Sequence, residues 1–278
     1  MYRSLIMQSR ALGRTGLQVS AVGMGTYQTF DVSGAAGEER CRRIAGEALG
    51  RGMNLFDSAP MYGEAERVLG LALEGRREEA LIATKVLERD ARSARASIER
   101  SFKLLRTGVI DLLQIHNMAG WRAVTPVLRE YQKEGRVRFI GVTDYRVSSY
   151  PEMMEAMRTG LYDTVQIPCY VGETTCRREI LPLARELNLG VIVMTPIAPI
   201  FGRGKLLGAL KGKDLSFLAP YGVRTPGQAL LKYVLSDPAV SAVIPATSKV
   251  ERVAENAAAG EGGPLPPAAL QQLERLLR

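Results

Sequence analysis

The stretch Asp111-Leu-Leu-Gln-Ile-His116 is a short apolar run that ends in the only histidine of the 278-residue chain. Two earlier apolar runs also end in a polar side chain, Asn54-Leu-Phe-Asp57 and Ala80-Leu-Ile-Ala-Thr-Lys85. A tyrosine, Tyr62, follows the first of these runs after five residues. In a parallel barrel all strands end on the same face, so these segments predict that their polar ends and Tyr62 converge on one point.

Apolar runs of strand length alternate along the chain with longer segments of helical periodicity. Strands that are apolar throughout are typical of a parallel sheet covered by helices, and eight strand–helix units close a barrel. The sequence therefore predicts a single α/β domain over residues 1–278, a (β/α)8 TIM barrel. The predicted strands are Val19–Thr26, Met53–Asp57, Ala80–Lys85, Val109–His116, Val137–Thr143, Thr164–Pro168, Gly190–Thr195 and Ser241–Pro245. The predicted helices are Glu38–Arg51, Ala65–Glu74, Ala91–Leu105, Val124–Lys133, Ser148–Arg158, Glu173–Leu187, Gly227–Leu235 and Lys249–Ala259.

Four segments lie outside this alternation. Ala11–Val19 has turn glycines between short apolar pieces and is predicted to form a β-hairpin at the barrel floor. Residues 1–9 are predicted to be a disordered extension. The connection Pro196–Pro226 is the longest irregular segment, and loops of such length often carry function. Residues 260–267, rich in glycine and proline, are predicted to link the barrel to a C-terminal helix.

Composition and charge narrow the class of protein. With 46% hydrophobic residues but no run of about 18 apolar residues, the chain is predicted to be globular, without a membrane span or secretory signal. Cys41, Cys169 and Cys176 lack the spacing of a metal site or a disulfide framework, which predicts a reduced, cytoplasmic setting and no metal. The net charge of +8 comes from scattered basic residues, so we expect an anionic cofactor or substrate rather than nucleic acid. We expect a monomer or a weak homo-oligomer.

The four converging side chains suit the reduction of a carbonyl group, which needs a hydride at carbon and a proton at oxygen. Tyr62 is the candidate proton donor. A phenol has a pKa of about 10, and we expect the ammonium of Lys85 to lower it. Asp57 is expected to keep Lys85 charged and oriented, and His116 to hydrogen-bond the carbonyl oxygen.

Each of these residues alone also has a plainer interpretation. The carboxylate is a candidate helix cap, the lysine a surface residue, the histidine a core residue bonded to backbone, and the tyrosine a packed loop aromatic. All four together, in this order and on consecutive strand ends, are much less expected by chance. The combination therefore favours the catalytic interpretation.

Several segments resemble signature motifs of the aldo-keto reductases. They occur in the order of that family and extend from Gly13 to about Asn256. The segments are Asn54-Leu-Phe-Asp-Ser-Ala-Pro-Met-Tyr-Gly-Glu-Ala-Glu-Arg-Val-Leu-Gly70, Ala83-Thr-Lys85, Asp111-Leu-Leu-Gln-Ile-His116, Ile140-Gly-Val-Thr-Asp144 and Ile244-Pro-Ala-Thr-Ser-Lys-Val-Glu-Arg-Val-Ala-Glu-Asn256.

The resemblance implies a (β/α)8 barrel that binds a nicotinamide cofactor without a Rossmann domain. It matches the family's catalytic tetrad to Asp57, Tyr62, Lys85 and His116, with Tyr62 as general acid. The implied function is NADPH-dependent reduction of aldehydes or ketones to alcohols, with NADH left open. Two alternatives are an NAD(P)-dependent sugar or polyol dehydrogenase and, from another class, a cofactor-sensing barrel that regulates a partner.

Polar groups beyond the tetrad predict where the cofactor binds. Thr143, Asp144 and Gln166 end the next two strands and are candidates to hold a carboxamide. The loop from Pro196 to Leu207 carries glycines and cations that let backbone and charge approach a pyrophosphate, with a plain flexible loop as the alternative.

The last strand–helix turn offers hydroxyls and cations suited to a ribose 2′-phosphate, which favours NADPH; an ordinary capped surface helix is the alternative. By resemblance, Arg252, Glu255 and Asn256 match the family's adenosine-binding residues. The predicted cofactor residues are Gly25, Thr26, Thr143, Asp144, Gln166, Met194, Thr195, Pro196, Ile197, Gly202, Gly204, Lys205, Thr247, Ser248, Lys249, Arg252, Glu255 and Asn256.

The chain departs from the family pattern at several positions. Asp144 stands where the family usually has asparagine, and an ionised acid cannot donate to a carboxamide oxygen. Met194 occupies the approximate place of an aromatic ring, where methionine can still pack. Ala246 replaces a lysine found in some members, which leaves more of the phosphate contact to the following cations. Cys169 and Tyr170 lie where relatives often have Tyr-Asn.

The substrate pocket is predicted from apolar residues near the strand ends, because small-molecule sites are mostly apolar. Tyr27, Met61 and Trp121 are the main candidates, with Phe30 and Met118 beside them, and core packing is the alternative for each. We expect an open site that accepts a broad range of aldehydes.

Overall fold

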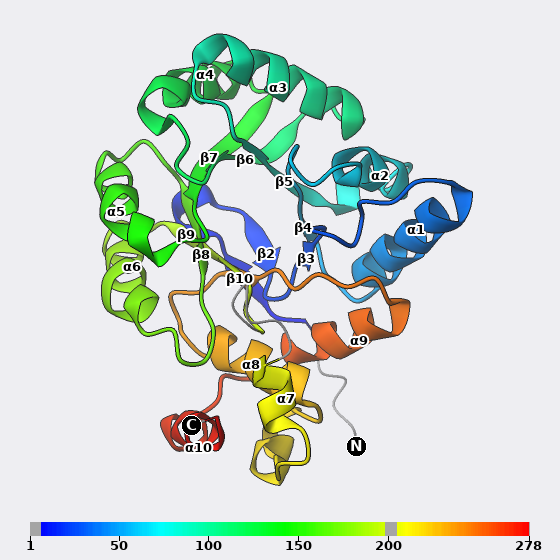
Figure 1. Ribbon diagram of the computed structural model, residues 1–278, viewed down its shortest axis with the longest axis vertical. Coiled ribbons are helices and arrows are strands. Elements are labelled where there is room, and N and C mark those ends of the chain that lie inside the picture. The colour runs from blue at the N-terminus through cyan, green and yellow to red at the C-terminus, as the bar shows by residue number, and fades with distance from the viewer. Residues whose placement is uncertain (1–6, 198–204, 278) are drawn as a thin grey trace.

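The computed structural model describes residues 7–197 and 205–277. Within this part of the chain, eight parallel strands form a ring that helices surround (Figure 1). The ring strands are β3 (Met24–Gly25), β4 (Leu55–Asp57), β5 (Leu81–Val86), β6 (Ile110–His116), β7 (Val137–Thr143), β8 (Thr164–Pro168), β9 (Gly190–Met194) and β10 (Ala242–Val243). The helices are α1 (Ala35–Gly50), α2 (Ala65–Ala72), α3 (Ala91–Leu104), α4 (Trp121–Lys133), α5 (Tyr150–Arg158), α6 (Thr175–Glu186), α7 (Lys205–Leu210), α8 (Pro226–Leu235), α9 (Val250–Ala259) and α10 (Pro267–Leu276). The predicted (β/α)8 barrel is confirmed.

The ring closes between its first and last strands. Parallel bridges pair Val22 with Val243 and Gly25 with Ala246. The Gly23 amide donates to the Val243 carbonyl at 2.8 Å. A closed ring of parallel strands brings their carboxyl ends to one rim, where side chains from distant parts of the sequence meet.

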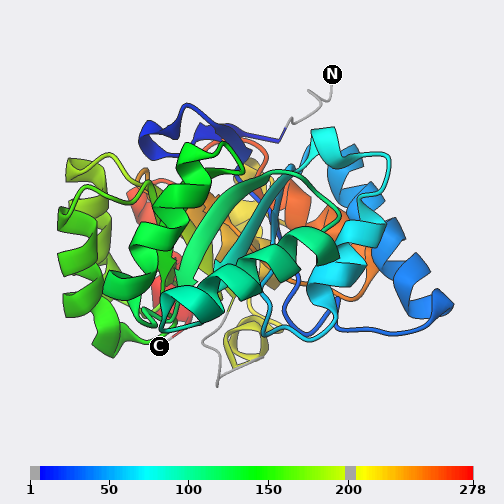
Figure 2. The same cartoon turned by 90° about the horizontal axis from the view of Figure 1, so that it is seen from above.

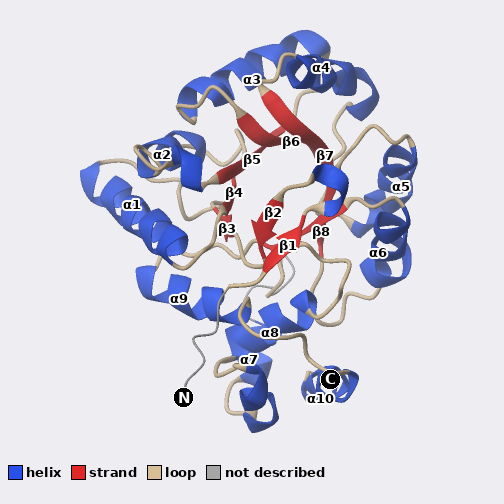
Figure 3. Ribbon diagram, turned by 180° about the vertical axis from the view of Figure 1, so that it is seen from behind, coloured by secondary structure: helices blue, strands red, loops and turns tan. Residues whose placement is uncertain are grey.

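A hairpin of β1 (Ser9–Ala11) and β2 (Gln18–Ser20) lies across the opposite end of the ring, as predicted (Figures 2 and 3). Gly13 lies in the connection between these two strands, with φ of +55°, and a Cβ there would lie 2.2 Å from the Gly190 amide nitrogen. The hairpin is therefore seated against the amino-terminal end of β9. Its buried residues Leu12 and Val19 join an apolar layer inside the ring that includes Leu55, Ala83, Leu112, Ile192, Ala242 and Ile244.

In two helices, α3 and α8, capping residues in the local sequence determine where the helix begins after a loop of the rim. The Asp90 carboxylate accepts a hydrogen bond from the Ser93 amide at 3.0 Å and begins α3. Thr225 and Gln228 form a reciprocal capping box at the start of α8, with Pro226 in its first turn. Such caps fix where a rim loop ends and a helix begins.

Four predictions about the elements need correction. The strand predicted at Val19–Thr26 is split between β2 and β3, since the chain leaves the hairpin and enters the ring within this run. The extension predicted at residues 1–9 is too long, because Met7 pairs with Glu261 and Ser9 begins β1. The irregular connection Pro196–Pro226 contains α7 and a 3-10 helix at Ser216–Tyr221. The helix predicted from Val124 begins at Trp121.

In residues 7–197 and 205–277, no helix combines the length and apolar character needed to cross a membrane.

Candidate active site

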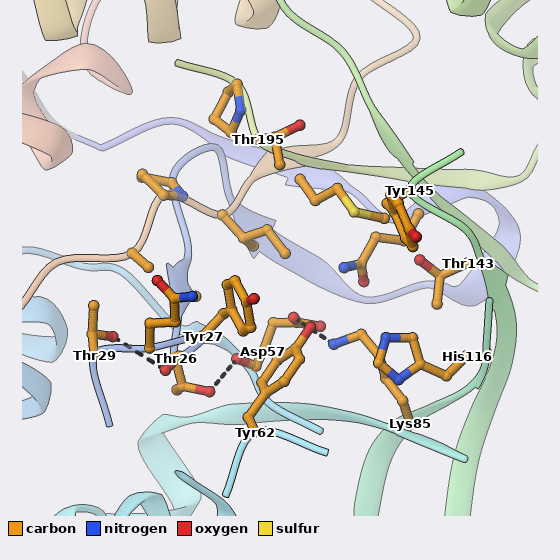
Figure 4. A pocket seen from close by; sticks show the side chains of 18 of the residues that line it. Thr26, Tyr27, Thr29, Asp57, Tyr62, Lys85, His116, Thr143, Tyr145 and Thr195 are labelled. Atoms are coloured by element: carbon orange, nitrogen blue, oxygen red, sulfur yellow. Dashed lines mark hydrogen bonds and ion pairs between the residues drawn. The ribbon is translucent and has the colours of Figure 1, made fainter. Parts of the chain in front are cut away.

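A cavity of about 670 Å³ opens at the carboxyl ends of the ring strands. Side chains that end β4 to β8 line it, together with Tyr62 (Figure 4). The rim also concentrates backbone strain: Gln28, Asn117 and Thr195 line the cavity with φ of 61°, 54° and 52°, in the left-handed region that non-glycine residues rarely adopt. Strained backbone of this kind clusters at functional sites.

A buried ion pair lies at the base of the cavity. Lys85 Nζ is 2.7 Å from Asp57 Oδ1 and also donates to the Ser58 carbonyl at 2.7 Å. The two side chains are only 1% and 4% exposed. Gln114 Nε2 donates to Gln166 Oε1 at 2.7 Å and approaches Asp57 Oδ2 at 3.5 Å. The carboxylate is therefore held from two sides.

Tyr62 stands over this pair. Lys85 Nζ is 5.0 Å from the centroid of the Tyr62 ring, and Figure 4 shows the two side chains next to each other. Tyr27 packs against the other side of Tyr62, with 5.0 Å between the ring centroids. The phenol is thus close to a cation and largely surrounded by protein.

The electrostatics of these groups differ from the expectation for Tyr62. Burial raises the pKa of the Tyr62 phenol, and the opposing effect of Lys85 is too small to reverse this. Burial likewise raises the pKa of Asp57, with Lys85 opposing it. Burial alone would lower the pKa of Lys85, but Asp57 and Tyr62 together raise it. Lys85 therefore stays charged and Tyr62 stays protonated at neutral pH.

His116 completes the group from the end of β6. Its ring meets the Tyr62 ring edge-on, with centroids 6.0 Å apart and an interplanar angle of 83°. Burial, helped by the Lys85 charge, lowers the pKa of His116 to about 3, so the imidazole is neutral at physiological pH. Its Nδ1 is buried and has no hydrogen-bond partner among the residues that the structure describes. The ring can therefore act as a neutral hydrogen-bond donor.

The turn that carries Tyr62 is held by a residue that the sequence analysis missed. Asp31 Oδ1 accepts the Glu64 amide at 3.0 Å. Gly63, with φ of +61°, leaves room for this carboxylate, since a Cβ there would lie 2.2 Å from the same oxygen. Asp31 comes from the loop after β3, and nothing local in the sequence marks it.

The structure brings many of the predicted cofactor residues to the cavity but not all of them. Lining the cavity are Gly25, Thr26, Thr143, Gln166, Met194, Thr195, Pro196 and Ile197. Outside the lining are Asp144, Lys205, Thr247, Ser248, Lys249, Arg252, Glu255 and Asn256. Gly202 and Gly204 lie outside the described residues.

Three of the residues outside the lining have other partners. Arg252 Nη1 lies 3.4 Å from Glu255 Oε2, and Glu255 Oε1 accepts the Thr225 hydroxyl at 2.7 Å. These contacts arrange the first turns of α9, beyond the cavity wall at Ala246. Asp144 turns its carboxylate to Arg146.

The substrate-pocket predictions divide in the same way. Tyr27 and Met61 line the cavity and are 42% and 51% exposed. Trp121 does not line it: the indole is buried and donates to Glu152 Oε1 at 2.9 Å, because Trp121 begins α4 and faces α5. Phe30 and Met118 are buried core residues. Lining residues that were not predicted are Gln28, Thr29, Asn117, Tyr145, Leu207, Ile244, Pro245 and Ala246. Two of them, Asn117 and Ala246, directly follow a predicted strand end.

Comparisons with known proteins find similarity along most of the chain. A sequence model of the Aldo/keto reductase family matches residues 21–278. The uncharacterized oxidoreductase YrpG of Bacillus subtilis (strain 168) is 34% identical over 253 residues, covering 80% of this chain and 73% of that protein. L-galactose dehydrogenase of Arabidopsis thaliana is 28% identical over 284 residues, covering 91% and 88%. An aldo/keto reductase from Klebsiella pneumoniae, solved in complex with NADP and acetate, has the same fold, with a TM-score of 0.82, 24% identity and coverage of 96% and 94%.

Proposed function

Since the chain belongs to the aldo/keto reductase family, whose members are NAD(P)H-dependent oxidoreductases acting on carbonyl groups, we propose that it reduces aldehydes and ketones with NADPH and that Tyr62 is its general acid. One observation carries the proposal: a protonated phenol, a buried ammonium–carboxylate pair and a neutral imidazole face one cavity at the barrel rim.

Tyr62 donates the proton in this mechanism. Its pKa is raised by burial, so the phenol keeps its proton until negative charge develops on the carbonyl oxygen. The Lys85 ammonium then stabilises the phenolate that remains. Asp57 keeps that ammonium charged and points it at the phenol.

His116 orients the carbonyl oxygen. Because its Nδ1 has no partner in the described part of the chain, the single ring proton is best placed on Nε2, which avoids a buried N–H without an acceptor. A neutral Nε2–H can donate to the oxygen without competing as a proton source. The oxygen is then fixed between the imidazole and the phenol.

The cavity also fits the nicotinamide end of the cofactor. Among the described residues, the hydroxyls of Thr143 and Thr195 are buried in its wall without hydrogen-bond partners. Gln166 lines the same wall, with its oxygen engaged by Gln114 and its side chain hydrogen-bonded to Asp57. Orphaned donors and acceptors of this kind suit a carboxamide. When bound, the cofactor supplies a hydride to the carbonyl carbon.

Turnover is the direct test of the proposal. The purified protein should oxidise NADPH in the presence of 4-nitrobenzaldehyde, followed at 340 nm, and convert the aldehyde to its alcohol. Cofactor binding without turnover of any aldehyde or ketone would favour the sensor alternative and contradict the reductase.

A sugar or polyol dehydrogenase is the second candidate, favoured by the similarity to L-galactose dehydrogenase. The same barrel and tetrad can serve oxidation, with Tyr62 as the base. A substrate panel run in both directions with NADP⁺ and NAD⁺ decides between the two: faster sugar oxidation than aldehyde reduction at neutral pH would favour the dehydrogenase.

Arg252→Ala is expected to weaken NADPH binding by about 10- to 100-fold while changing NADH binding little, because a charged hydrogen bond to phosphate contributes about 1.5–3 kcal/mol. The side chain of Arg252 is 53% exposed and can turn from Glu255 to a phosphate, and its helix α9 begins four residues after Ala246 of the cavity wall. Fluorescence titration with each cofactor measures the effect, and equal weakening of both would show that no 2′-phosphate is recognised there.

The pH profile of reduction is expected to lack an inflection between pH 5 and 8. An unperturbed histidine titrates at about 6.5, but the pKa of His116 is lowered to about 3, and it is the only histidine. The imidazole is therefore neutral throughout this range. A fall in kcat/KM with a midpoint near 6.5 would contradict the assignment.

A further inference from the structure

The turn that follows His116 is strained. Asn117 and Met118 both have φ of 54°, so two consecutive non-glycine residues adopt the left-handed conformation. Such a conformation is unfavourable for these residues and persists only where surrounding contacts hold it. The Met118 amide donates to the Thr143 carbonyl at 3.2 Å, which ties the turn to the end of β7.

A second tie comes from Arg146, on the loop after β7. Its Nη2 donates to the Asn117 carbonyl at 3.3 Å. The same guanidinium grips Asp144 in a fork, with Nε 3.0 Å from Oδ1 and Nη2 2.7 Å from Oδ2. The Arg146 amide also donates to Asp144 Oδ1 at 2.8 Å. Asp144 is fully buried and the Arg146 side chain is 49% exposed, so the aspartate anchors the arginine against the turn.

His116 needs such a support from its backbone. In metal sites and catalytic sites the second ring nitrogen usually makes a hydrogen bond that fixes the imidazole. Here Nδ1 makes none among the described residues. The ring direction therefore depends on packing against Tyr62 and on the backbone that leaves β6 at Asn117.

We propose that Arg146, anchored by Asp144, is a positioning residue that holds the strained Asn117–Met118 turn and thereby aims the His116 imidazole into the cavity. The inference rests on the proposed function. It also gives Asp144 another role. At the position where the family resemblance implies an asparagine, this chain carries a carboxylate that holds Arg146, and Thr143 and Gln166 remain in the cavity wall to hold the carboxamide.

The first test replaces Arg146 with lysine, which keeps the charge beside Asp144 but loses the planar fork. A single ammonium cannot hold both carboxylate oxygens and the Asn117 carbonyl. We expect kcat for aldehyde reduction to fall about 10- to 100-fold, because small misplacement of a catalytic group has effects of this size, with the NADPH dissociation constant changed less than about twofold.

Arg136→Lys is the matched control. Arg136 grips Glu99 in a similar fork, at 2.6 and 3.0 Å, and its side chain is 37% exposed. It precedes β7, at the end of the ring away from the cavity. This variant should leave kcat unchanged.

The second test observes His116 without any turnover. Since the chain has one histidine, the imidazole C–H resonances of tag-free protein report His116 directly in an NMR pH titration. The charged or titratable groups that face the ring are Tyr62, Lys85 and Asp144. In Asp144→Asn, loss of the negative charge alone would shift the His116 titration to lower pH, whereas a loosened, hydrated turn would shift it to higher pH.

We expect an upward shift of about one pH unit or more in both Asp144→Asn and Arg146→Lys, towards the value of a solvated histidine. Two results together would overturn the proposal: a kcat of Arg146→Lys equal to that of the unaltered protein, and a His116 titration midpoint in Asp144→Asn that is unchanged or lower. The proposal would also be overturned if Asp144→Asn bound NADPH more weakly while the His116 titration midpoint stayed unchanged, because Asp144 would then act on the cofactor. An upward shift in a protein that reduces no carbonyl compound would support the positioning role and count against the reductase.

Discussion

Replacing Tyr62 with phenylalanine is expected to lower kcat for aldehyde reduction by about 10²- to 10⁴-fold, the usual contribution of a general acid. The substitution removes only the hydroxyl. The ring can keep its contacts with Tyr27 and His116, so the cavity and the neighbouring groups should stay in place. Steady-state turnover of NADPH with 4-nitrobenzaldehyde measures the loss.

Two measurements separate this loss from damage to the fold. The NADPH dissociation constant of Tyr62→Phe should match that of the unaltered protein. Tyr131→Phe removes a phenol that donates to Glu99 Oε1 at 2.8 Å, outside the cavity lining, and should keep full activity. Full activity in Tyr62→Phe would mean that another group delivers the proton.

Replacing Lys85 with methionine is expected to abolish most activity and to lower the free energy of unfolding by about 3–5 kcal/mol. Methionine fills a similar volume, but it leaves the Asp57 carboxylate buried without its cation, and Asp57 is almost inaccessible to water. Urea denaturation gives the change in stability. The double variant Asp57→Asn with Lys85→Met should regain most of the stability and none of the activity.

The stability deficit of Lys85→Met should also depend on pH. Burial raises the pKa of Asp57 in the folded state even when Lys85 is present, and losing the cation raises it further. A carboxyl with a higher pKa in the folded than in the unfolded state stabilises the folded state as it takes up a proton. The deficit should therefore shrink as pH falls from 8 to 5. A deficit that grows on acidification would show that the carboxylate is not the uncompensated group.

The sequence was sufficient for the barrel and for the group of four side chains, because both depend on where apolar runs end. The rule that a continuous apolar run forms one strand gave a wrong result at one place. It predicted a single strand where β2 and β3 are separate, because the apolar residues between them are also buried. The prediction that Trp121 lines the pocket was wrong because its place in the sequence, shortly after a strand end, does not reveal which way a side chain in the first helical turn points. Here the indole points to Glu152 of α5.

Other features depend on three-dimensional surroundings that no local pattern encodes. The sequence placed a cation near Tyr62 and predicted a lowered pKa, but the degree of burial, which dominates, emerges only from the packed rim. Asp31 acts on a turn more than thirty residues later in the chain, through a hydrogen bond to the Glu64 amide. The grip of Arg146 on Asn117 depends on a left-handed turn at residues that carry no glycine to mark it.

The hairpin beneath the ring has a consequence for the catalytic cycle. Leu12 and Val19, with the apolar layer above them, fill the barrel axis below the ion pair. Reprotonation of the phenolate through this layer is unfavourable, because its buried apolar side chains have no group that can relay a proton. Each replacement proton is therefore expected to enter from bulk solvent through the mouth, which product and spent cofactor occupy until they leave. Tyr62 is then reprotonated after the product leaves, so that proton uptake is coupled in time to product release.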